Sequence, residues 1–269
     1  MRLRQHPAIV PVLLLVLGSL IAVRPAAARP LADRQESLPP HAPALPPSPA
    51  FFQRSDIAFG LASAGAVAIA GHNDLWLRCK AIAFRPPFAR DLARAAQPLG
   101  NPVFVAPALL AGYGIAHAFH APAVGSGLTE IGWSVVVAGA GALALKEVVG
   151  RARPVHSPDD NHSFEPFSGE LSFPSGHATV AFALAEAIDR TTGSRWAPWL
   201  TYPVAALVGW SRVRDDQHWT SDVVAGAALG VWTARKVHRM LPAERRLLSH
   251  FGLGALLPDG TPGLRVTLR

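Results

Sequence analysis

Three short polar clusters in the second half of the chain carry side chains that could bind and transfer a phosphoryl group. The first cluster holds Lys146 and Arg153, seven residues apart and followed directly by Pro154. Seven residues make about two helical turns, so both cations can project from one face of a helix that the proline ends. In isolation, this cluster is typical of a basic helix terminus that complements the helix dipole.

The second cluster is Pro174-Ser175-Gly176-His177, at the start of an apolar segment. A serine at a helix start ordinarily caps the helix with its hydroxyl. Ser175 followed by Gly176 also leaves backbone N–H groups free and lets an anion approach the backbone closely. His177 is the next residue, so its ring can reach an anion bound at this helix start.

The third cluster begins with Ser211-Arg212 and continues to His218 and Asp222. His218 and Asp222 lie four residues apart and can share one face of a helix. A carboxylate that holds one imidazole nitrogen orients the ring and raises its basicity, which leaves the other nitrogen free to attack. In isolation, the same spacing is common for a surface pair.

The three clusters together form a set suited to phosphoryl transfer without a metal ion. Lys146, Arg153 and Arg212, with the helix N-terminus, would neutralise the equatorial phosphoryl oxygens. His218 would attack phosphorus in line to give a phosphohistidine, and His177 would protonate the departing oxygen. His177 would then act as the base when water releases phosphate.

The polar loop between the first two clusters is interpreted as a surface segment. Its His156 and His162 lie near Asp159 and Asp160, but their irregular spacing and loop placement do not favour a metal site. We therefore expect no metal and no cofactor. Four charged neighbours of the motif residues are interpreted as solvated loop charges: Arg151, Arg214, Asp215 and Asp216.

In this order and spacing, the clusters resemble the signature of the type 2 phosphatidic acid phosphatase superfamily, which also includes bacterial acid phosphatases and vanadium-dependent haloperoxidases. The matching motifs are Lys146-x6-Arg153-Pro154, Pro174-Ser175-Gly176-His177 and Ser211-Arg212-x5-His218-x3-Asp222. The resemblance covers about residues 128–240 and implies an all-helical bundle that hydrolyses phosphomonoesters or pyrophosphates through a phosphohistidine. It assigns the nucleophile to His218, the general acid to His177 and the support of the nucleophile to Asp222. The phosphate contacts that it implies are Lys146, Arg153, Ser175, Gly176 and Arg212.

The elements that must position these clusters are six apolar segments rich in Ala, Leu and Gly. None of them shows the sustained alternation of a strand, so we predict an all-α fold, a six-helix bundle of the acid phosphatase and vanadium haloperoxidase type. The clusters fall at segment ends that would share one side of the bundle. The predicted helices are residues 56–71, 103–120, 128–150, 176–189, 196–210 and 221–240.

The segments outside the bundle suggest an exported protein. Residues 1–28 have the basic start, apolar run and A-x-A site of a signal peptide, with an uncleaved anchor as the alternative. Residues 29–55 form a Pro-rich linker, residues 56–246 the helical domain and residues 247–269 a C-terminal tail without an assigned function. The lone Cys79 excludes an intrachain disulfide.

Composition leaves open whether the bundle is soluble or embedded in a membrane. Half of the residues are hydrophobic and 16% are charged, below the usual quarter. Most apolar runs are shorter than the ~20 residues of a span, and the basic segment 71–102 would lie on the outer side against the positive-inside tendency. Basic residues at the opposite helix ends favour a membrane arrangement. We expect a periplasmic bundle, soluble or peripherally attached, with an integral inner-membrane protein as the alternative.

The sequence therefore predicts a metal-independent phosphatase. Its substrate would be a phosphorylated lipid or a small molecule, and the sequence gives no oligomeric state. The net charge of +7 comes from scattered residues without interleaved aromatic side chains, which disfavours nucleic-acid binding. Two alternatives are a vanadate-dependent haloperoxidase and a non-enzymatic lipid- or anion-binding membrane protein. The intact set of His177, His218 and Asp222 argues against the second, because anion binding needs neither an acid nor an oriented nucleophile.

Overall fold

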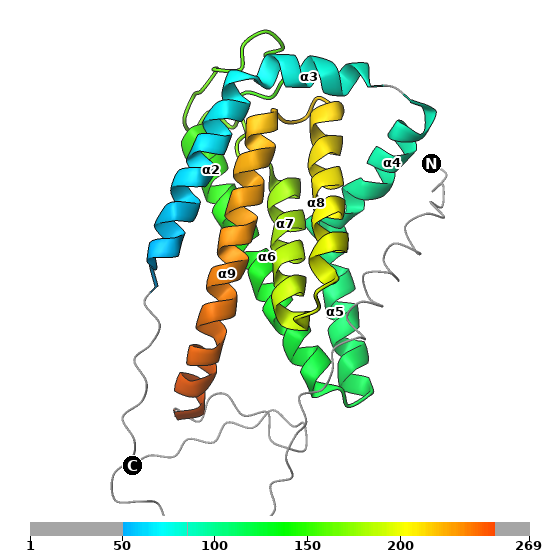
Figure 1. The fold of residues 1–269 in the computed structure, drawn as a ribbon, viewed down its shortest axis with the longest axis vertical. Coiled ribbons are helices and arrows are strands. Elements are labelled where there is room, and N and C mark those ends of the chain that lie inside the picture. The colour runs from blue at the N-terminus through cyan, green and yellow to red at the C-terminus, as the bar shows by residue number, and fades with distance from the viewer. Residues whose placement is uncertain (1–50, 85, 251–269) are drawn as a thin grey trace, which may run out of the picture.

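The computed structural model describes residues 51–84 and 86–250, which form a bundle of helices (Figure 1). No strand occurs among these residues, and an isolated bridge joins Arg151 to Phe164. The prediction of an all-α bundle is confirmed. The six predicted helices correspond to α2 (Arg54–His72), α5 (Pro102–Ala118), α6 (Pro122–Val149), α7 (Gly176–Thr192), α8 (Ala197–Arg214) and α9 (Thr220–His250).

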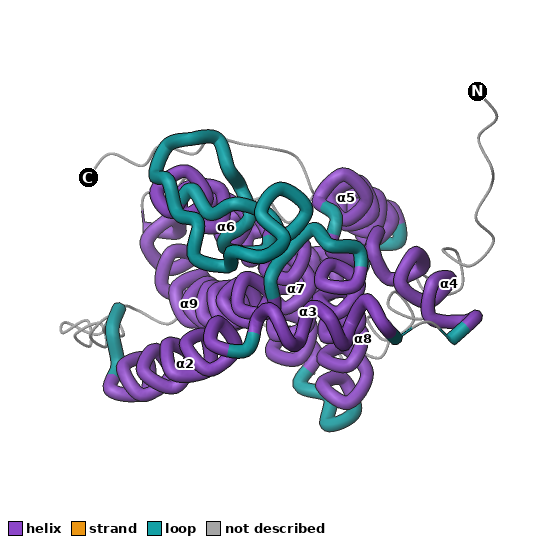
Figure 2. The backbone as a smooth tube through the Cα atoms, turned by 90° about the horizontal axis from the view of Figure 1, so that it is seen from above, coloured by secondary structure: helices purple, strands orange, loops and turns teal. Residues whose placement is uncertain are grey.

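Two further helices, which the sequence does not predict, lie between α2 and α5. They are α3 (Asp74–Ala83) and α4 (Pro87–Ala96), followed by a 3-10 turn (Gln97–Gly100). Small side chains form the inner face of α4, because Ala89, Ala93 and Ala96 are all buried. Figure 2 shows α3 lying across one end of the bundle, where it contacts α8 and α9.

Helix α7 lies at the centre and packs against α6, α8 and α9 (Figure 1). Its contact with α9 is made backbone to backbone, at the small-xxx-small pair Gly226 and Gly230. A Cβ atom added at Gly226 would lie 2.5 Å from the Ser175 carbonyl oxygen, and one at Gly230 would lie 2.3 Å from that of Thr179. Glycine at both positions therefore sets how closely α9 approaches the start of α7.

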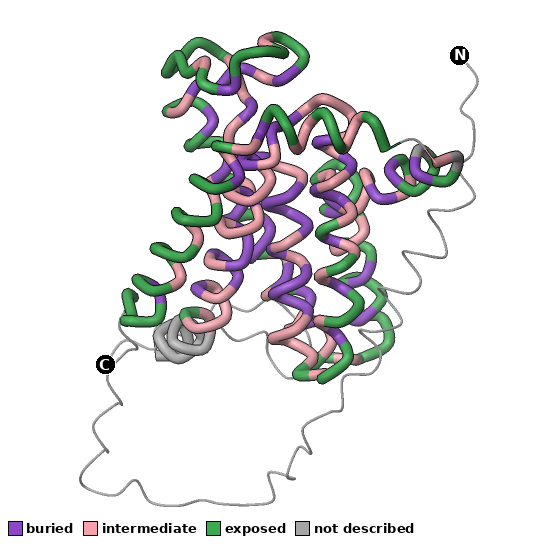
Figure 3. Tube along the Cα trace, turned by 45° about the horizontal axis from the view of Figure 1, so that its top comes forward, coloured by how far each residue is buried: buried purple, intermediate pink, exposed green. Residues whose placement is uncertain are grey.

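Large apolar side chains remain exposed on the outer helices, while buried positions gather on the central ones (Figure 3). Helix α6 has 28 residues, and only 33% of its most apolar window is buried inside the bundle. By length and composition, α6 is the single described helix able to cross a membrane, and the bent pair Asp91–Gly100 and Pro102–Ala118 would be a second candidate. Helix α6 begins at Pro122, before the predicted start at residue 128, because the helix includes small and polar residues that precede the apolar run.

The predicted boundaries outside the bundle meet the structure in two places. The signal peptide at residues 1–28 and most of the linker lie outside the described residues. Helix α2 begins at Arg54, just inside the predicted linker. The predicted tail begins at residue 247, whereas α9 continues to His250 and the remainder lies outside the described residues.

Candidate active site

Within the first motif, the backbone turns sharply after the end of α6. The helix ends at Val149, because Gly150 adopts a left-handed conformation with φ 55°. A Cβ atom there would lie 1.7 Å from the Glu165 carbonyl oxygen, so glycine is required. The prediction that Lys146 and Arg153 share one helix face is therefore wrong, since Arg153 follows the turn.

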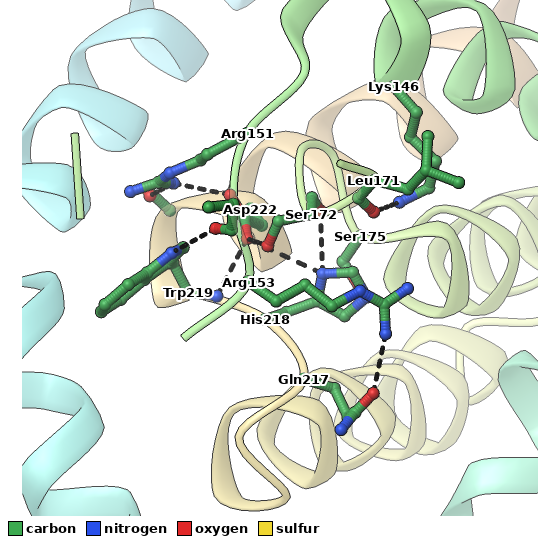
Figure 4. A network of polar contacts seen from close by, with 12 residues as sticks. Lys146, Arg151, Arg153, Leu171, Ser172, Ser175, Gln217, His218, Trp219 and Asp222 are labelled. Atoms are coloured by element: carbon green, nitrogen blue, oxygen red, sulfur yellow. Dashed lines mark hydrogen bonds and ion pairs between the residues drawn. The ribbon is translucent and has the colours of Figure 1, made fainter. Parts of the chain in front are cut away.

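Lys146 and Arg153 nevertheless reach the same place from different elements (Figure 4). Lys146 is buried on the last turn of α6 and donates a hydrogen bond to the Leu171 carbonyl oxygen. Its Cε atom lies 3.7 Å from where a Cβ would stand at Gly176. Arg153 Nη1 donates to Gln217 Oε1 at 2.7 Å, which holds the guanidinium beside the third motif.

The second motif places a buried hydroxyl at the start of α7. Ser175 occupies the N-cap position, but its side chain makes no cap hydrogen bond. Among the described residues, its Oγ atom has no hydrogen-bond partner, and the same holds for Nε of Arg212. Arg214 Nε is a third such atom. Buried polar atoms are nearly always paired, so the unpaired donors of Ser175 and Arg212, which belong to the second and third motifs, are candidates to bind a ligand that accepts hydrogen bonds.

The third motif orients a buried histidine. His218 is 4% exposed, and its Nδ1 lies 2.8 Å from the carbonyl oxygen of Ser172. Asp222 Oδ2 is 3.7 Å from the same nitrogen, beyond hydrogen-bond distance. The direct partner is thus a backbone carbonyl, and Asp222 acts behind it by accepting from Ser172 Oγ at 2.6 Å and from the Trp219 backbone N–H at 2.9 Å. The carbonyl places the proton on Nδ1 and leaves Nε2 as the free nitrogen.

The electrostatic environment lowers the pKa of both histidines and so favours their neutral forms. Burial, followed by the charge of Arg212, lowers the pKa of His177 to about 4. Burial also lowers the pKa of His218, against the opposing effect of Asp222. The charges of Lys146 and Arg153 act in the same direction on both rings, which shows that the three motifs converge. The site therefore combines cationic side chains with a histidine whose neutral, nucleophilic form is favoured.

The interpretation of Arg151 as a solvated loop charge is wrong. It is 3% exposed and bonded to two buried carboxylates, Asp74 at 2.9 Å and Asp222 at 2.6 Å. Its position inside the first motif was the available signal, but the sequence does not show that Asp74 would come to meet it. Asp216 is also paired, because Arg78 on α3 donates to its two carboxylate oxygens at 2.6 and 2.8 Å.

The polar loop contains one close His–carboxylate contact, His156 Nδ1 to Glu170 at 3.1 Å. Within the described part of the chain, no group of three or more His, Cys, Asp or Glu side chains is arranged to hold a metal ion. Two contributors that sequence reasoning missed are Ser172 and Gln217. Ser172 contacts His218 through its backbone carbonyl, and the residue type at a position gives no sign of such a contact.

Comparison with known proteins agrees with the geometry. The family model of the PAP2 superfamily matches residues 127–246, which contain all three motifs. Lipid A 1-phosphatase of Rhizobium johnstonii is 42% identical over 110 residues, or 37% of this chain and 42% of that protein. Undecaprenyl-diphosphatase of Sulfolobus acidocaldarius is 34% identical over 107 residues, covering 38% and 52%. The chain thus spans about half, or less, of the length of these relatives.

A solved structure supports the fold. The transmembrane PAP2-type phosphatidylglycerolphosphate phosphatase of Bacillus subtilis superposes with a TM-score of 0.54 at 21% identity, over 71% of this chain and 98% of that one. At this identity the likeness concerns the arrangement of helices alone. Residues 127–246, which carry the three motifs at one end of the bundle, therefore match the PAP2 superfamily.

Proposed function

We propose that this protein is a metal-independent phosphatase that works through a phosphohistidine. The observation that carries the proposal is that two motif residues hold buried, unpaired donors, Ser175 Oγ and Arg212 Nε, while the ring of His218 in the third motif is oriented by a hydrogen bond. A phosphoryl group would accept hydrogen bonds from both. Lys146 and Arg153 would neutralise its remaining oxygens, which is the main catalytic task in phosphoryl transfer.

The reaction would proceed in two displacements. In the first, Nε2 of His218 bonds to phosphorus while the bond from phosphorus to the leaving oxygen breaks, and His177 gives that oxygen a proton. In the second, His177 takes a proton from water, whose oxygen attacks phosphorus as the nitrogen–phosphorus bond breaks. Inorganic phosphate leaves, and both histidines return to their starting protonation states.

A phosphorylated lipid is the substrate class that we favour, as a monoester or a pyrophosphate. The names of the relatives support it, since those proteins are described as acting on lipid A and undecaprenyl diphosphate. The exposed apolar side chains of α5 and α6 give independent support, because a membrane would cover them. We therefore propose that the protein is membrane-associated, with α6 as the candidate span. Export of the site end to the periplasm is proposed from residues 1–28.

The proposal is tested by assaying the purified protein in the presence of a chelator. Phosphatidic acid, a polyprenyl diphosphate and p-nitrophenyl phosphate serve as parallel substrates. We expect phosphate release, inhibition by vanadate, and an acid-labile phosphoenzyme after rapid quenching with radiolabelled substrate. His218→Ala should abolish both turnover and labelling. Full turnover in that variant, or labelling that survives acid, would refute the assigned nucleophile.

A further inference from the structure

A buried ion-pair chain lies behind the nucleophile and begins on α3, outside all three motifs. Asp74, at the first position of α3, is fully buried. Its Oδ1 accepts the Ser221 backbone N–H at 2.9 Å, and its Oδ2 accepts from Arg151 Nη2 at 2.9 Å. Arg151 Nη1 donates in turn to Asp222 Oδ1 at 2.6 Å and to Ser221 Oγ at 2.7 Å. Arg151 therefore bridges two carboxylates that are both hidden from solvent.

The network of buried hydrogen bonds continues from Asp222 to the His218 ring. The second carboxylate oxygen of Asp222 accepts from Ser172 Oγ at 2.6 Å, and the carbonyl oxygen of Ser172 lies 2.8 Å from His218 Nδ1. Figure 4 shows the part of this network between Arg151 and His218. The ring angle of the nucleophile is thus linked, through hydrogen bonds between buried groups, to the start of α3.

Charge counting gives Asp74 a specific task. Arg151 paired with Asp222 alone would cancel the negative charge that faces His218. With Asp74 on its other side, the guanidinium is shared between two carboxylates, and one net negative charge remains behind the ring. That charge matters when Nε2 bonds to phosphorus, because positive charge then develops on the imidazole in a place of low dielectric.

We propose that Asp74 and Arg151 are positioning residues for the phosphatase reaction, acting on His218 through Asp222 and Ser172. The proposal rests on the proposed function for its kinetic consequences. It concerns α3, which no motif includes and which the family match at residues 127–246 does not cover. Neither residue would touch the substrate.

The same helix offers a matched control for the simple alternative that Asp74 only anchors α3. A second anchor, Arg78, pairs with Asp216 and donates to the Pro158 carbonyl oxygen at 3.0 Å. Asp216→Asn removes that ion pair with the same isosteric change as Asp74→Asn, but it leaves the chain from Asp74 to His218 intact. Loosening of α3 would affect both variants, whereas loss of the charge would affect Asp74→Asn alone.

The test compares kcat, KM and the pH profile of kcat/KM for Asp74→Asn, Arg151→Lys and Asp216→Asn. We expect kcat to fall about 10–100-fold in Asp74→Asn and Arg151→Lys, with KM near the wild-type value. Losses of this size follow the removal of residues that hydrogen-bond to metal-binding histidines and orient them. The acid limb of kcat/KM should move to lower pH in Asp74→Asn, because removing a negative charge lowers the pKa of His218. The other charged groups that face this ring, Asp222, Lys146, Arg153 and His177, are unchanged in that variant.

Three results separate the outcomes. Asp74→Glu should recover part of kcat, since it restores the charge. Equal losses in Asp74→Asn and Asp216→Asn would overturn the proposal in favour of plain docking of α3. Losses in Asp74→Asn and Arg151→Lys that simply add in the double variant would also overturn it, because residues of one chain should combine less than additively. Where Asp74→Asn does not fold, Arg151→Lys, which keeps the charge but loses the bridge between the two carboxylates, tests the positioning role against Asp216→Asn.

A readout that needs no turnover keeps this proposal distinct from the proposed function. The nitrogen chemical shifts of the His218 ring, in protein labelled selectively at histidine, report its tautomer and hydrogen bonding. We expect a change in Asp74→Asn and none in Asp216→Asn. If the wild-type protein released no phosphate, the proposed function would fail, and unchanged His218 shifts would overturn the positioning role separately.

Discussion

At the scale of single residues, Ser175 shows how a site for an anion can be recognised while it holds no ligand. A buried hydroxyl without a partner costs free energy, so the folded protein gains nothing from it until something accepts its hydrogen bond. We predict that Ser175→Ala leaves the melting temperature unchanged or slightly raised, while vanadate binding weakens about 10–100-fold, the value of a hydrogen bond to a charged group.

The control for Ser175 is Ser134, which is equally buried on α6 but donates to the Glu130 carbonyl oxygen at 2.9 Å. Ser134→Ala should leave vanadate affinity at the wild-type value. Inhibition constants and thermal melts of the two variants provide the measurement. A Ser175→Ala protein that melts well below wild type and binds vanadate normally would assign the hydroxyl a purely structural role.

His177 provides a prediction about pH and leaving groups. Its pKa of about 4, lowered first by burial and next by Arg212, means that the fraction carrying the leaving-group proton falls tenfold for each pH unit above 4. Since kcat/KM reports the free enzyme, kcat/KM for an alkyl phosphate should decline toward alkaline pH. His177→Ala should lose about 10²–10⁴-fold with that substrate and far less with p-nitrophenyl phosphate, whose leaving group needs no proton. Equal losses with both substrates would contradict the role of general acid.

The residue scale also marks the limit of what the sequence could reveal. Residue types and spacing select Lys146, Ser175 and His218 as candidates, because phosphoryl transfer needs cations, hydrogen-bond donors and a nucleophile. They could not show that a backbone carbonyl would hold the His218 ring, since a carbonyl belongs to every residue. The sequence predicts a solvated charge at Arg151, because its buried partner, Asp74, lies far away along the chain.

At the scale of elements, the contact between α7 and α9 decides whether the motifs meet. Gly226 and Gly230 let the α9 backbone touch that of α7, and α7 carries Ser175 and His177 at its start. We predict that Gly230→Ala pushes the two helices apart, lowers the melting temperature and reduces kcat, because a Cβ there would lie 2.3 Å from a backbone oxygen that cannot move freely.

Gly139 on α6 is the matched control, since a Cβ atom added there meets nothing within 4 Å. Gly139→Ala should keep full activity and gain up to about 1 kcal/mol of helix stability. Thermal unfolding and the phosphatase assay compare the two alanines directly. Similar behaviour of both variants would mean that close approach of α9 is not what positions the site.

Helix type was easier to predict than helix extent. The apolar runs identified six helices, because burial and helical composition agree there. They missed α3 and α4, whose basic residues and prolines read as a connection, although Ala89, Ala93 and Ala96 form a small buried face. At the first motif, the predicted helix is too long. The seven-residue spacing of Lys146 and Arg153 fits a helix, but Gly150 ends α6 before Arg153.

At the scale of the whole molecule, the apolar outer surface and the proposed lipid substrate both favour a membrane environment. Trp133, Val136 and Leu143 on α6 are each more than half exposed, on a helix whose apolar window is only one-third buried. The core helix of a soluble bundle would hide most of such a window. Lipid around this surface would also supply a phosphorylated lipid directly to the end of the bundle where the motifs gather.

This surface gives the last prediction, which decides between the two arrangements that composition left open. Cells expressing the protein are fractionated, and phosphatase activity is assayed in the periplasmic contents and in membranes before and after a carbonate wash. We expect the activity to stay with the washed membranes and to be released by detergent, because burial of apolar area in lipid does not depend on charge. A peripheral protein held by its basic residues would leave in the wash, and a soluble one would appear in the periplasmic contents. A variant with Gln in place of Trp133, Val136, Val137 and Leu143 makes the test sharper. In a soluble protein these four changes should leave the phosphatase activity unchanged. In a membrane protein they should lower the fraction of activity that stays with the washed membranes, because each polar side chain must then be buried in hydrocarbon.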